Sequence, residues 1–355
     1  MKGLVLAGRE TIEVRHDLPD PEIEAPGDVI VAVGRAGICG SDLHPYHGRE
    51  PVAWGIVPGH EAAGEVVEVG SAVEQFQSGD RVFLPFTTSC GTCPPCLAGL
   101  SARCDLGRLF GWASPEADAP AGLGGTQAEL VRVPLADTTL LSLPEDFGLE
   151  DGVLLGDNFT TGFYCARQGG EVAGGLVVVI GCGAVGLSAV VSARHFGAGR
   201  IVAVDPVSSR RETALRLGAD VVASSDEAAD VIAGLPAPDD RGARVVLEAV
   251  GNLSARELCL ELVAPGGTIS MVGVATDESG LAAADLYDRN LTLRSGRCPV
   301  RSLMPEVMAA LRRAHVRIPT SDLVADPPVP LEQGPEAYRR FAARSGPDGK
   351  PLLAP

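Results

Sequence analysis

The chain has 355 residues, of which 45% are hydrophobic and 21% charged, and its formal net charge is −17. At roughly 150 residues per domain, this length predicts two domains with enough apolar side chains to bury their cores. The acidic balance argues against a general phosphate-backbone binder, and no Lys/Arg cluster is present that would dock on an anionic membrane. We therefore expect no nucleic acid and no membrane as partner.

The nine cysteines are too few for a disulfide framework, and four of them lie within fifteen residues. Clustered thiols beside isolated ones indicate metal binding in a reducing compartment. The first seven residues lack the features of a signal peptide and are typical of an opening strand, so we expect a cytoplasmic protein. Only two of the 29 basic residues are lysines, Lys2 and Lys350, which we interpret as a compositional bias without functional meaning.

The first part of the chain, residues 1–157, is rich in short β-type runs separated by glycine and proline. These runs are Val29–Val33, Ala63–Val69, Arg81–Leu84 and Glu129–Val133. No long helical period appears among them, which predicts an irregular β-rich domain.

Between residues 158 and 295 the pattern changes to alternating strands and helices. The apolar runs are Leu176–Ile180, Ile201–Val204, Val221–Val222, Val245–Leu247, Thr268–Val272 and Leu291–Leu293. Strand–helix alternation predicts a parallel sheet that is covered on both faces. The uncharged stretch Val172–Ala193 contains five glycines, so we interpret it as a strand, a tight turn and a helix, not as a membrane span.

The tail, residues 296–355, contains a predicted helix over 304–314, followed by Pro-rich extended chain. It is too short for a domain of its own, and we expect it to pack on the first domain.

A glycine motif, G-x-G-x-x-G, connects the first strand of the alternating region to the next helix. Gly181 permits the turn, Gly183 lets the backbone approach a pyrophosphate, and Gly186 lets helix and strand pack closely. Ala184 and Val185 then begin the helix, whose free N–H groups would meet the pyrophosphate. The alternative interpretation is an ordinary strand–helix turn.

An acidic residue, Asp205, follows the second strand of the region. A carboxylate there accepts hydrogen bonds from the adenosine ribose hydroxyls and repels a 2′-phosphate, which favours NAD over NADP. Arg210 lies close enough in sequence to weaken this preference.

Four thiols occur on one stretch, at about residues 89–105: Cys90, Cys93, Cys96 and Cys104. They suffice for a closed tetrahedral zinc site, which braces a loop and performs no chemistry. An iron–sulfur cluster is the alternative, but the last spacing, of seven residues, matches neither ferredoxin pattern.

A second set of motifs is dispersed over the segments 37–44, 58–61 and 156–162. Spacing alone does not connect these segments, and His60 taken by itself is typical of an ordinary surface or core histidine.

Together the motifs resemble those of the zinc-dependent medium-chain alcohol dehydrogenases, over essentially the whole chain. They are Gly-Ile-Cys-Gly-Ser-Asp-Leu-His, Gly-His-Glu, the four-cysteine loop, and the glycine motif with its acid. The segments 155–157 and 296–301 are similar to a formaldehyde-dehydrogenase-like branch of uncertain substrate. The resemblance implies an α/β fold: a Rossmann NAD-binding domain (158–295) inserted in a split, β-rich GroES-like catalytic domain (1–157 and 296–355).

The resemblance also implies roles for single residues. Cys39, His60 and Asp157 match the three ligands of a catalytic zinc, with aspartate where many relatives have cysteine. Glu61 resembles a carboxylate that sits behind the metal and can coordinate it transiently. Further matches are Ser41 and His44 for a proton relay, Val250, Val272 and Val274 beside the cofactor, and Phe86 and Leu109 in the substrate pocket.

We therefore expect an enzyme with NAD and two zinc ions per chain, one catalytic and one structural, that interconverts a small alcohol and its aldehyde or ketone. Formaldehyde dehydrogenase or aldehyde dismutase activity on an aldehyde hydrate is one alternative. A non-catalytic NAD-binding protein of the same fold is another. The family also implies a homo-oligomer, either a dimer or a tetramer.

Overall fold

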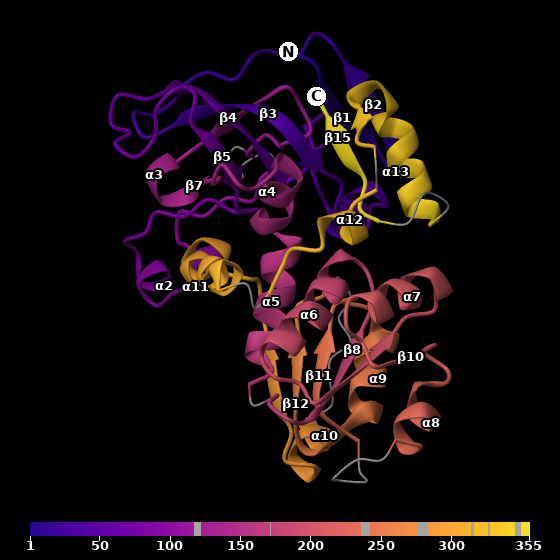
Figure 1. The fold of residues 1–355 in the computed structure, drawn as a ribbon. Coiled ribbons are helices and arrows are strands. Elements are labelled where there is room, and N and C mark those ends of the chain that lie inside the picture. The colour runs from indigo at the N-terminus through magenta and orange to yellow at the C-terminus, as the bar shows by residue number, and fades with distance from the viewer. Residues whose placement is uncertain are drawn as a thin grey trace. The chain divides into compact units, whose positions relative to one another are not determined.

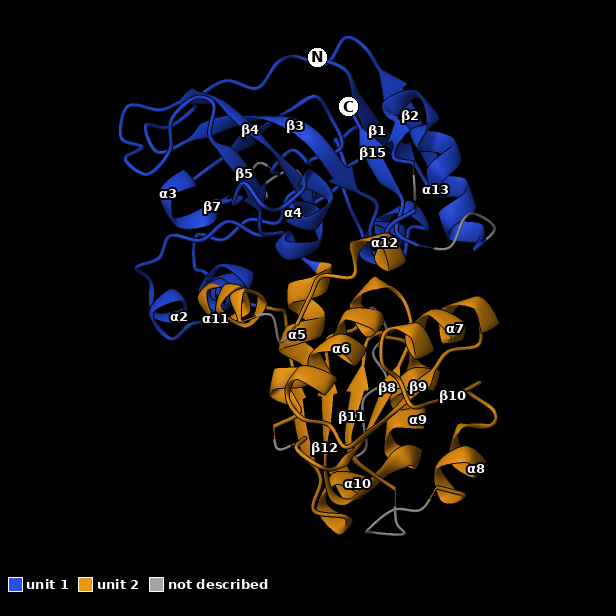
Figure 2. Cartoon of the chain, in the orientation of Figure 1, with its two compact units in different colours: residues 1–157, 299–304, 324–355 blue, residues 158–298, 305–323 orange. Residues whose placement is uncertain are grey.

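Figure 1 shows the fold of the computed structural model, which describes residues 1–116, 122–170, 172–235, 242–275, 283–313, 316–325, 327–344 and 349–355. The chain divides into two compact units (Figure 2). Unit 1 comprises Met1–Asp157, Pro299–Met304 and Val324–Pro355, and unit 2 comprises Asn158–Cys298 and Pro305–Leu323.

The tail of the chain contributes to both units, whereas we expected all of residues 296–355 in the first domain. Helix α11 (Val300–Arg312) begins in unit 1 and continues into unit 2. Its Glu306 forms an ion pair at 2.8 Å with Arg167, which lies on helix α5 (Asn158–Gln168). This ion pair is one contact between the second part of α11 and the rest of unit 2. The boundaries of the functional domains stay a prediction.

Unit 1 is built on antiparallel sheets. Strands β1 (Gly3–Gly8) and β2 (Thr11–Arg15) pair with each other. A seven-stranded sheet has the order β14-β15-β3-β4-β5-β7, with β6 paired to β3. Its strands are β3 (Val29–Gly37), β4 (Ala62–Val69), β5 (Arg81–Leu84), β6 (Leu130–Val133), β7 (Leu141–Ser142), β14 (Val329–Pro330) and β15 (Leu352–Ala354). The strands predicted in this region are therefore confirmed as β3, β4, β5 and β6.

Short helices connect the strands of unit 1: α1 (Leu43–Tyr46), α2 (Pro94–Leu97), α3 (Ala136–Thr139), α4 (Leu149–Gly156) and α13 (Gly334–Ala343). The prediction of extended chain for the last part of the tail was wrong at α13. Pro335 occupies the first turn of this helix, where proline is well tolerated. The helix buries Tyr338 in the core, with 1% of the residue exposed.

Unit 2 contains a six-stranded parallel sheet in the order β10-β9-β8-β11-β12-β13. Its strands are β8 (Leu176–Ile180), β9 (Arg200–Val204), β10 (Val221–Ala223), β11 (Ala243–Glu248), β12 (Val263–Met271) and β13 (Thr292–Ser295). Its other helices are α6 (Ala184–His195), α7 (Ser208–Arg216), α8 (Ala228–Ala233), α9 (Leu253–Leu262), α10 (Ala283–Asp288) and α12 (Thr320–Leu323). The predicted α/β class, with a parallel sheet in one unit and a β-rich fold in the other, is confirmed.

The uncharged stretch Val172–Ala193 contains β8 and most of α6, as predicted. Every residue of β8 is buried, as expected for a central strand that is covered on both faces. Among the described residues, no helix combines the length and the hydropathy needed to cross a membrane.

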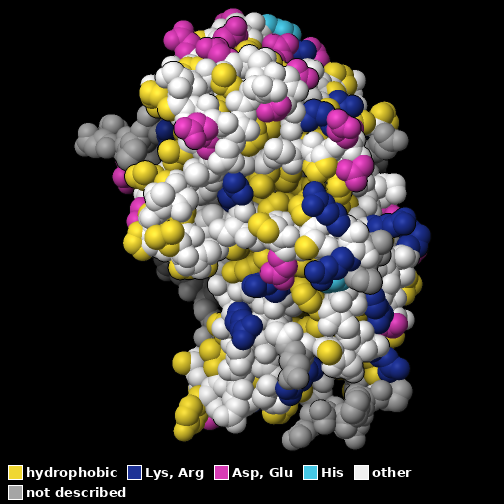
Figure 3. Space-filling view, turned by 60° about the vertical axis from the view of Figure 1, so that its left-hand side comes forward, with side chains coloured by type: hydrophobic (Ala, Val, Ile, Leu, Met, Phe, Trp, Pro, Cys, Tyr) yellow, Lys and Arg dark blue, Asp and Glu magenta, His cyan; other side chains and the backbone are white. Residues whose placement is uncertain are grey.

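Apolar side chains also remain at the surface of each unit. Figure 3 shows such side chains in yellow on one face, among acidic and basic ones. Leu97 on α2 is 75% exposed, and Tyr287 on α10 is 84% exposed.

Candidate active site and metal centres

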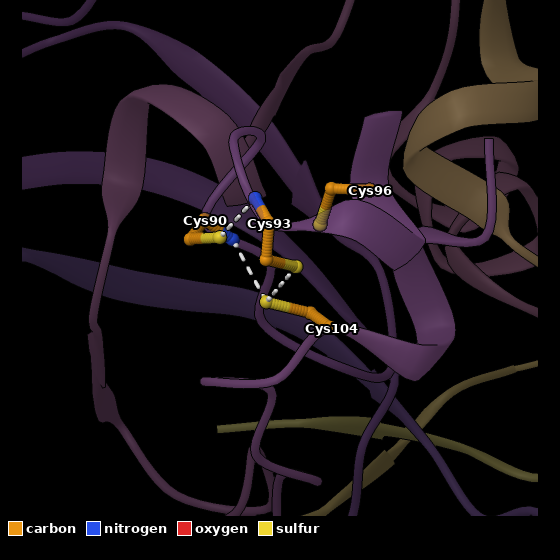
Figure 4. A group of neighbouring side chains, drawn as sticks. All are labelled: Cys90, Cys93, Cys96 and Cys104. Carbon is orange, nitrogen blue, oxygen red and sulfur yellow. Dashed lines mark hydrogen bonds between the residues drawn. The ribbon is translucent and has the colours of Figure 1, made fainter. Parts of the chain in front are cut away.

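Among the described residues, two groups place metal-ligating atoms within 4.8 Å of one another. The first is the predicted four-cysteine loop, whose thiols point toward a common centre (Figure 4). Backbone N–H groups donate to these sulfurs: Cys90 N to Cys104 Sγ at 3.2 Å, and Cys93 N to Cys90 Sγ at 3.3 Å. All nine cysteines lie in the described part of the chain and are free of disulfides. The loop therefore brings four sulfur atoms close together, which is the number of ligands that a structural zinc takes.

The second group joins the dispersed motifs, as predicted: Cys39, His60, Glu61 and Asp157. His60 and Asp157 are each 8% exposed, and Glu61 is fully buried. The distance from Cys39 Sγ to Asp157 Oδ2 is 3.7 Å, and the distance from His60 Nε2 to the same oxygen is 3.6 Å. A thiol, an imidazole and a carboxylate thus converge in one place.

One row of paired residues across three strands of the sheet in unit 1 explains this convergence. Ala36 on β3 pairs with Ala62 on β4, which pairs with Leu84 on β5. Cys39 follows β3, and His60 and Glu61 immediately precede β4, so all three emerge at the same end of these strands.

Helix α4 delivers the third ligand to the same row. Asp157 is the C-terminal cap of this helix. The preceding residue, Gly156, packs so tightly on β5 that a Cβ atom would overlap the carbonyl oxygen of Leu84. The lack of a side chain at Gly156 therefore brings Asp157 up to the row of paired residues.

The orientation of His60 is fixed by a residue to which the sequence analysis gave no role. Asp42 Oδ1 lies 3.1 Å from His60 Nδ1, which leaves Nε2 directed at Cys39 and Asp157. Asp42 Oδ2 in turn accepts a hydrogen bond from the backbone N of Cys39 at 2.8 Å. Gln127 also contacts Asp42 Oδ2, at 3.4 Å, and accepts a hydrogen bond from the hydroxyl of Tyr338 at 2.8 Å. Carboxylate–histidine pairs of this kind orient metal-binding imidazoles.

A second residue that the sequence analysis missed is Lys350. Its Nζ forms an ion pair with Glu61 Oε2 and donates to the carbonyl of Ile38 at 3.2 Å, while only 4% of the residue is exposed. Gly37 makes room for the pair, because a Cβ there would overlap the Glu61 carboxylate. Strand β15, whose Leu352 pairs with Gly37, brings Lys350 to the same row. The compositional interpretation of the lysine count therefore did not anticipate this place for Lys350.

The buried charges shift one another's pKa values. Burial raises the pKa of Glu61 to about 7, although Lys350 acts in the opposite direction. Burial also raises the pKa of the Cys39 thiol. Burial opposes ionisation of Asp157 as well, but hydrogen bonds with His60 and Glu61 hold its pKa at about 2. The Asp157 carboxylate is thus charged at neutral pH and suited to bind a cation.

Of the two residues matched to a proton relay, Ser41 lies beside this group. Ser41 Oγ is 3.2 Å from His60 Nε2. His44, on α1, is half-buried, and its Nδ1 atom has no hydrogen-bond partner among the described residues. Burial, together with the nearby charge of Arg49, lowers the pKa of His44, so its imidazole is neutral at pH 7 and able to accept a proton.

The glycine motif in unit 2 has the expected geometry. Gly181 has a φ of +91°, a conformation that L side chains rarely adopt. Gly183 is the N-terminal cap of α6, which begins at Ala184 and Val185. A Cβ on Gly186 would overlap the carbonyl oxygen of Gly181, so the strand and the helix approach closely, as predicted.

Asp205 follows β9 and is 4% exposed. Its Oδ2 accepts a hydrogen bond from the backbone N of Cys182 at 2.8 Å, and its Oδ1 accepts one from Val207 N at 2.8 Å. Arg210 Nη1 lies 4.0 Å from Oδ2. The acid therefore contacts the glycine turn directly.

The remaining predicted site residues fall into two places. In unit 2, Val250 and Val274 are 39% and 46% exposed, and Val272 is half-buried, all of them just beyond the carboxyl ends of β11 and β12. In unit 1, Phe86 is 7% exposed and Leu109 is half-buried. These last two lie on adjoining segments, because Thr87 pairs with Leu109.

Comparison with known proteins adds an independent line of support. The alcohol dehydrogenase GroES-like domain matches residues 25–145, and the zinc-binding dehydrogenase family matches residues 184–313. The chain is 40% identical to zinc-type alcohol dehydrogenase B of Aspergillus flavus over 335 residues, which are 92% of this chain and 76% of the relative. It is 37% identical to the "Probable zinc-binding alcohol dehydrogenase" of Mycobacterium tuberculosis, over 100% of this chain and 89% of that protein.

A solved structure agrees with these matches. An alcohol dehydrogenase from Thermus sp. ATN1 is similar with a TM-score of 0.89 and 35% identity, covering 100% of this chain and 99% of that one. The fold, the two ligand groups and these similarities lead to one conclusion: the chain belongs to the zinc-dependent medium-chain alcohol dehydrogenases.

Proposed function

We propose that this chain transfers a hydride between a small alcohol and NAD, with a catalytic zinc held by Cys39, His60 and Asp157. The observation that carries the proposal is the convergence of these three side chains with Glu61, within 4.8 Å. The set fits Zn²⁺, which prefers sulfur, nitrogen and carboxylate ligands, and a thiolate with a carboxylate balances its charge. The four-cysteine loop fits a second, structural zinc, which gives two ions per chain.

The two ligand groups serve different purposes because they offer different numbers of ligands. Four thiolates close a tetrahedral shell, so the loop would hold its metal only as a brace. In the other group Glu61 is engaged by Lys350, which leaves three ligands for the metal and a fourth position for substrate. When bound there, zinc acts as a Lewis acid that lowers the pKa of a hydroxyl group.

Side chains of this protein transfer the proton that an alcohol must lose to solvent. Ser41, beside His60, receives the proton through its hydroxyl group. His44 then accepts it on its neutral imidazole and delivers it to solvent. Asp42 keeps the His60 ring in place throughout, because it holds Nδ1 while Nε2 faces the other ligands.

NAD is the cofactor that unit 2 favours. The glycine turn and the start of α6 offer backbone N–H groups to a pyrophosphate. Asp205, buried against that turn, accepts hydrogen bonds from ribose hydroxyls and repels a 2′-phosphate. Arg210, at 4.0 Å from the acid, reduces this repulsion in part, so discrimination against NADP is incomplete.

The substrate is a small alcohol or carbonyl compound, held against the apolar side chains of Phe86 and Leu109. We also propose that the chain forms a dimer or a tetramer. The exposed apolar residues Leu97 and Tyr287, and the exposed edge strand β13, are surfaces of the kind that association covers. Light scattering on the purified chain measures the assembly directly.

A panel of alcohols and aldehydes, assayed by NADH absorbance, tests the proposed function. We expect alcohol-dependent reduction of NAD that is lost when a chelator strips the zinc and returns when zinc is restored. Formate produced from formaldehyde, with no alcohol oxidised, would favour the formaldehyde dehydrogenase alternative. NADH binding without turnover of any member of the panel would favour the non-catalytic alternative.

A further inference from the structure

The strand order of unit 2 singles out one position in its sheet. In the order β10-β9-β8-β11-β12-β13, successive strands are added outward on one side of β8 and then, from β11, on its other side. The order in which the chain adds strands therefore reverses between β8 and β11. In doubly wound sheets, ligands bind beyond the carboxyl ends of the strands at this reversal. The glycine motif follows β8, and the last residue of β11 is Glu248. Glu248 pairs with Ile180, the last residue of β8, so it lies beside the glycine turn.

The Glu248 side chain is an unusual group for a sheet interior, because it is a carboxylate with no solvent exposure. Its Oε1 accepts hydrogen bonds from the backbone N of Val250 and of Gly251, each at 2.6 Å. Its backbone carbonyl accepts from Val272 N at 3.0 Å and Gly273 N at 3.3 Å. One residue therefore holds two loops, 249–251 after β11 and 272–274 after β12.

The second carboxylate oxygen also faces the loop after β12. A Cβ atom on Gly273 would lie 2.7 Å from Glu248 Oε2, closer than real Cβ atoms come. Oε2 itself has no hydrogen-bond partner among the described residues. The carboxylate thus fills the space between the two loops.

A buried arginine completes the arrangement. Arg256, on α9, is 3% exposed and donates from Nη1 to the carbonyl of Gly251 at 2.9 Å. The backbone of Gly251 is therefore held at its N–H by a carboxylate and at its carbonyl by a guanidinium group. Gly251 has a φ of +88°, and a Cβ there would overlap the carbonyl of Val274. Only glycine allows the two loops to meet in this way.

These loops touch the glycine motif itself. A Cβ on Gly181 would lie 2.5 Å from a methyl group of Val250, so the loop after β11 packs directly on the turn after β8. Because the turn is expected to carry the pyrophosphate, a shift of Val250 would displace the backbone on which the cofactor rests.

We propose that Glu248 is a positioning residue for the cofactor: its carboxylate fixes the loop 249–251, which meets the loop 272–274, against the glycine turn and thereby sets the affinity for NAD(H). Glu248 acts through the backbone and does not itself touch the dinucleotide. The inference rests on the proposed cofactor site in unit 2.

Calorimetric titration of the purified full-length chain with NADH tests this role. Glu248→Met keeps the size of the side chain but removes the acceptor of two N–H groups, one of them buried, and we expect NADH binding to weaken about tenfold or more. Glu248→Gln keeps an oxygen that can accept from both N–H groups and is expected to restore affinity to within about threefold.

Ser270→Ala is the matched control for a general loss of stability. Ser270 is fully buried on β12, and its hydroxyl donates to the carbonyl of Cys165 on α5 at 2.8 Å. We expect this variant to melt at a lower temperature and to bind NADH as the wild type does. The proposal is overturned if Glu248→Met also loses only stability and keeps the wild-type affinity.

Hydrogen exchange of the wild-type chain gives a second test that needs no variant to fold. The amides of Val250 and Gly251 should exchange slowly before NADH is added and more slowly afterwards. If NADH leaves the exchange rates of these two amides unchanged, the positioning role is contradicted. A wild-type chain that binds no NADH would instead contradict the proposed cofactor use itself.

Discussion

Lys350 and Glu61 form an ion pair in the interior of unit 1, with 4% of the lysine and none of the glutamate exposed. Two side chains 289 positions apart in sequence thus share one buried site beside Cys39 and Asp157. A buried pair of this kind is costly to break, because removing one partner leaves an uncompensated charge. The cation therefore holds Glu61 in place next to the candidate metal ligands.

Lys350→Met should destabilise the protein and alter its metal affinity. We expect the free energy of unfolding of the metal-free chain to fall by about 3 kcal/mol or more. The zinc affinity of the variant should be higher than that of the wild type, because the released Glu61 carboxylate becomes available as a ligand. Denaturant unfolding and competition with a chromophoric chelator measure the two effects.

Lys2→Met is the matched control, because Lys2 is the other lysine of the chain. Its Nζ lies 3.1 Å from Glu332, whose side chain is 51% exposed. An exposed pair contributes about 1 kcal/mol or less, so the control should change neither stability nor zinc affinity appreciably. Equal effects of the two variants would contradict the role given to Lys350.

Cys39→Ser and Asp157→Ala should each abolish turnover. Each change removes a ligand from a set of three, while the proposed dinucleotide site in unit 2 is untouched. NADH titration should therefore give nearly the wild-type dissociation constant, and the NADH absorbance assay should show no activity. Cys165→Ser, at a buried thiol of α5, serves as the control and should keep activity. Full activity of the Asp157 variant would remove that residue from the ligand set.

Asp205→Ala should weaken NAD binding and narrow the preference for NAD over NADP. The substitution removes the acceptor for Cys182 N and Val207 N and the charge that repels a 2′-phosphate. Steady-state kinetics with both cofactors measure the ratio of their kcat/KM values. Asp220→Ala is the control, because Asp220 bonds the N–H of Ile201 near the opposite end of β9. An unchanged ratio for Asp205→Ala would count against the ribose contact.

His44→Gln should slow turnover and make the rate depend on buffer. His44 is neutral at pH 7 because burial and Arg49 lower its pKa, so its loss removes a proton acceptor. Added imidazole should restore part of the rate at neutral pH. His47→Gln provides the comparison, since His47 Nδ1 lies 2.9 Å from the exposed Glu10. A relay through His44 is contradicted if both variants keep the wild-type rate without added buffer.

Much of this architecture can be predicted from local patterns. Strand β8, the glycine turn and α6 can be predicted because the apolar run, the glycines and the helix that follows are all in one short stretch of sequence. The four-cysteine loop is similarly local. The set of Cys39, His60 and Asp157 is different, because only the resemblance connects three distant segments. The register of β3, β4 and β5 supplies the physical reason for their convergence.

The residues that sequence reasoning missed are those whose roles depend on topology. Lys350 enters the site because β15 pairs with β3, and nothing near residue 350 indicates that pairing. Glu248 follows an apolar strand like many surface acids, and its burial depends on the loops that fold over it. Asp42 lay within a recognised motif, and only the 3.1 Å contact with His60 reveals its function.

The most direct test of the central claim is a crystal structure of the zinc-loaded chain with anomalous data collected at the zinc absorption edge. We predict one anomalous peak at roughly two ångströms from Cys39 Sγ, His60 Nε2 and an Asp157 carboxylate oxygen, and a second among the four loop sulfurs. A zinc-loaded chain with no peak at bonding distance from the first three side chains would contradict it.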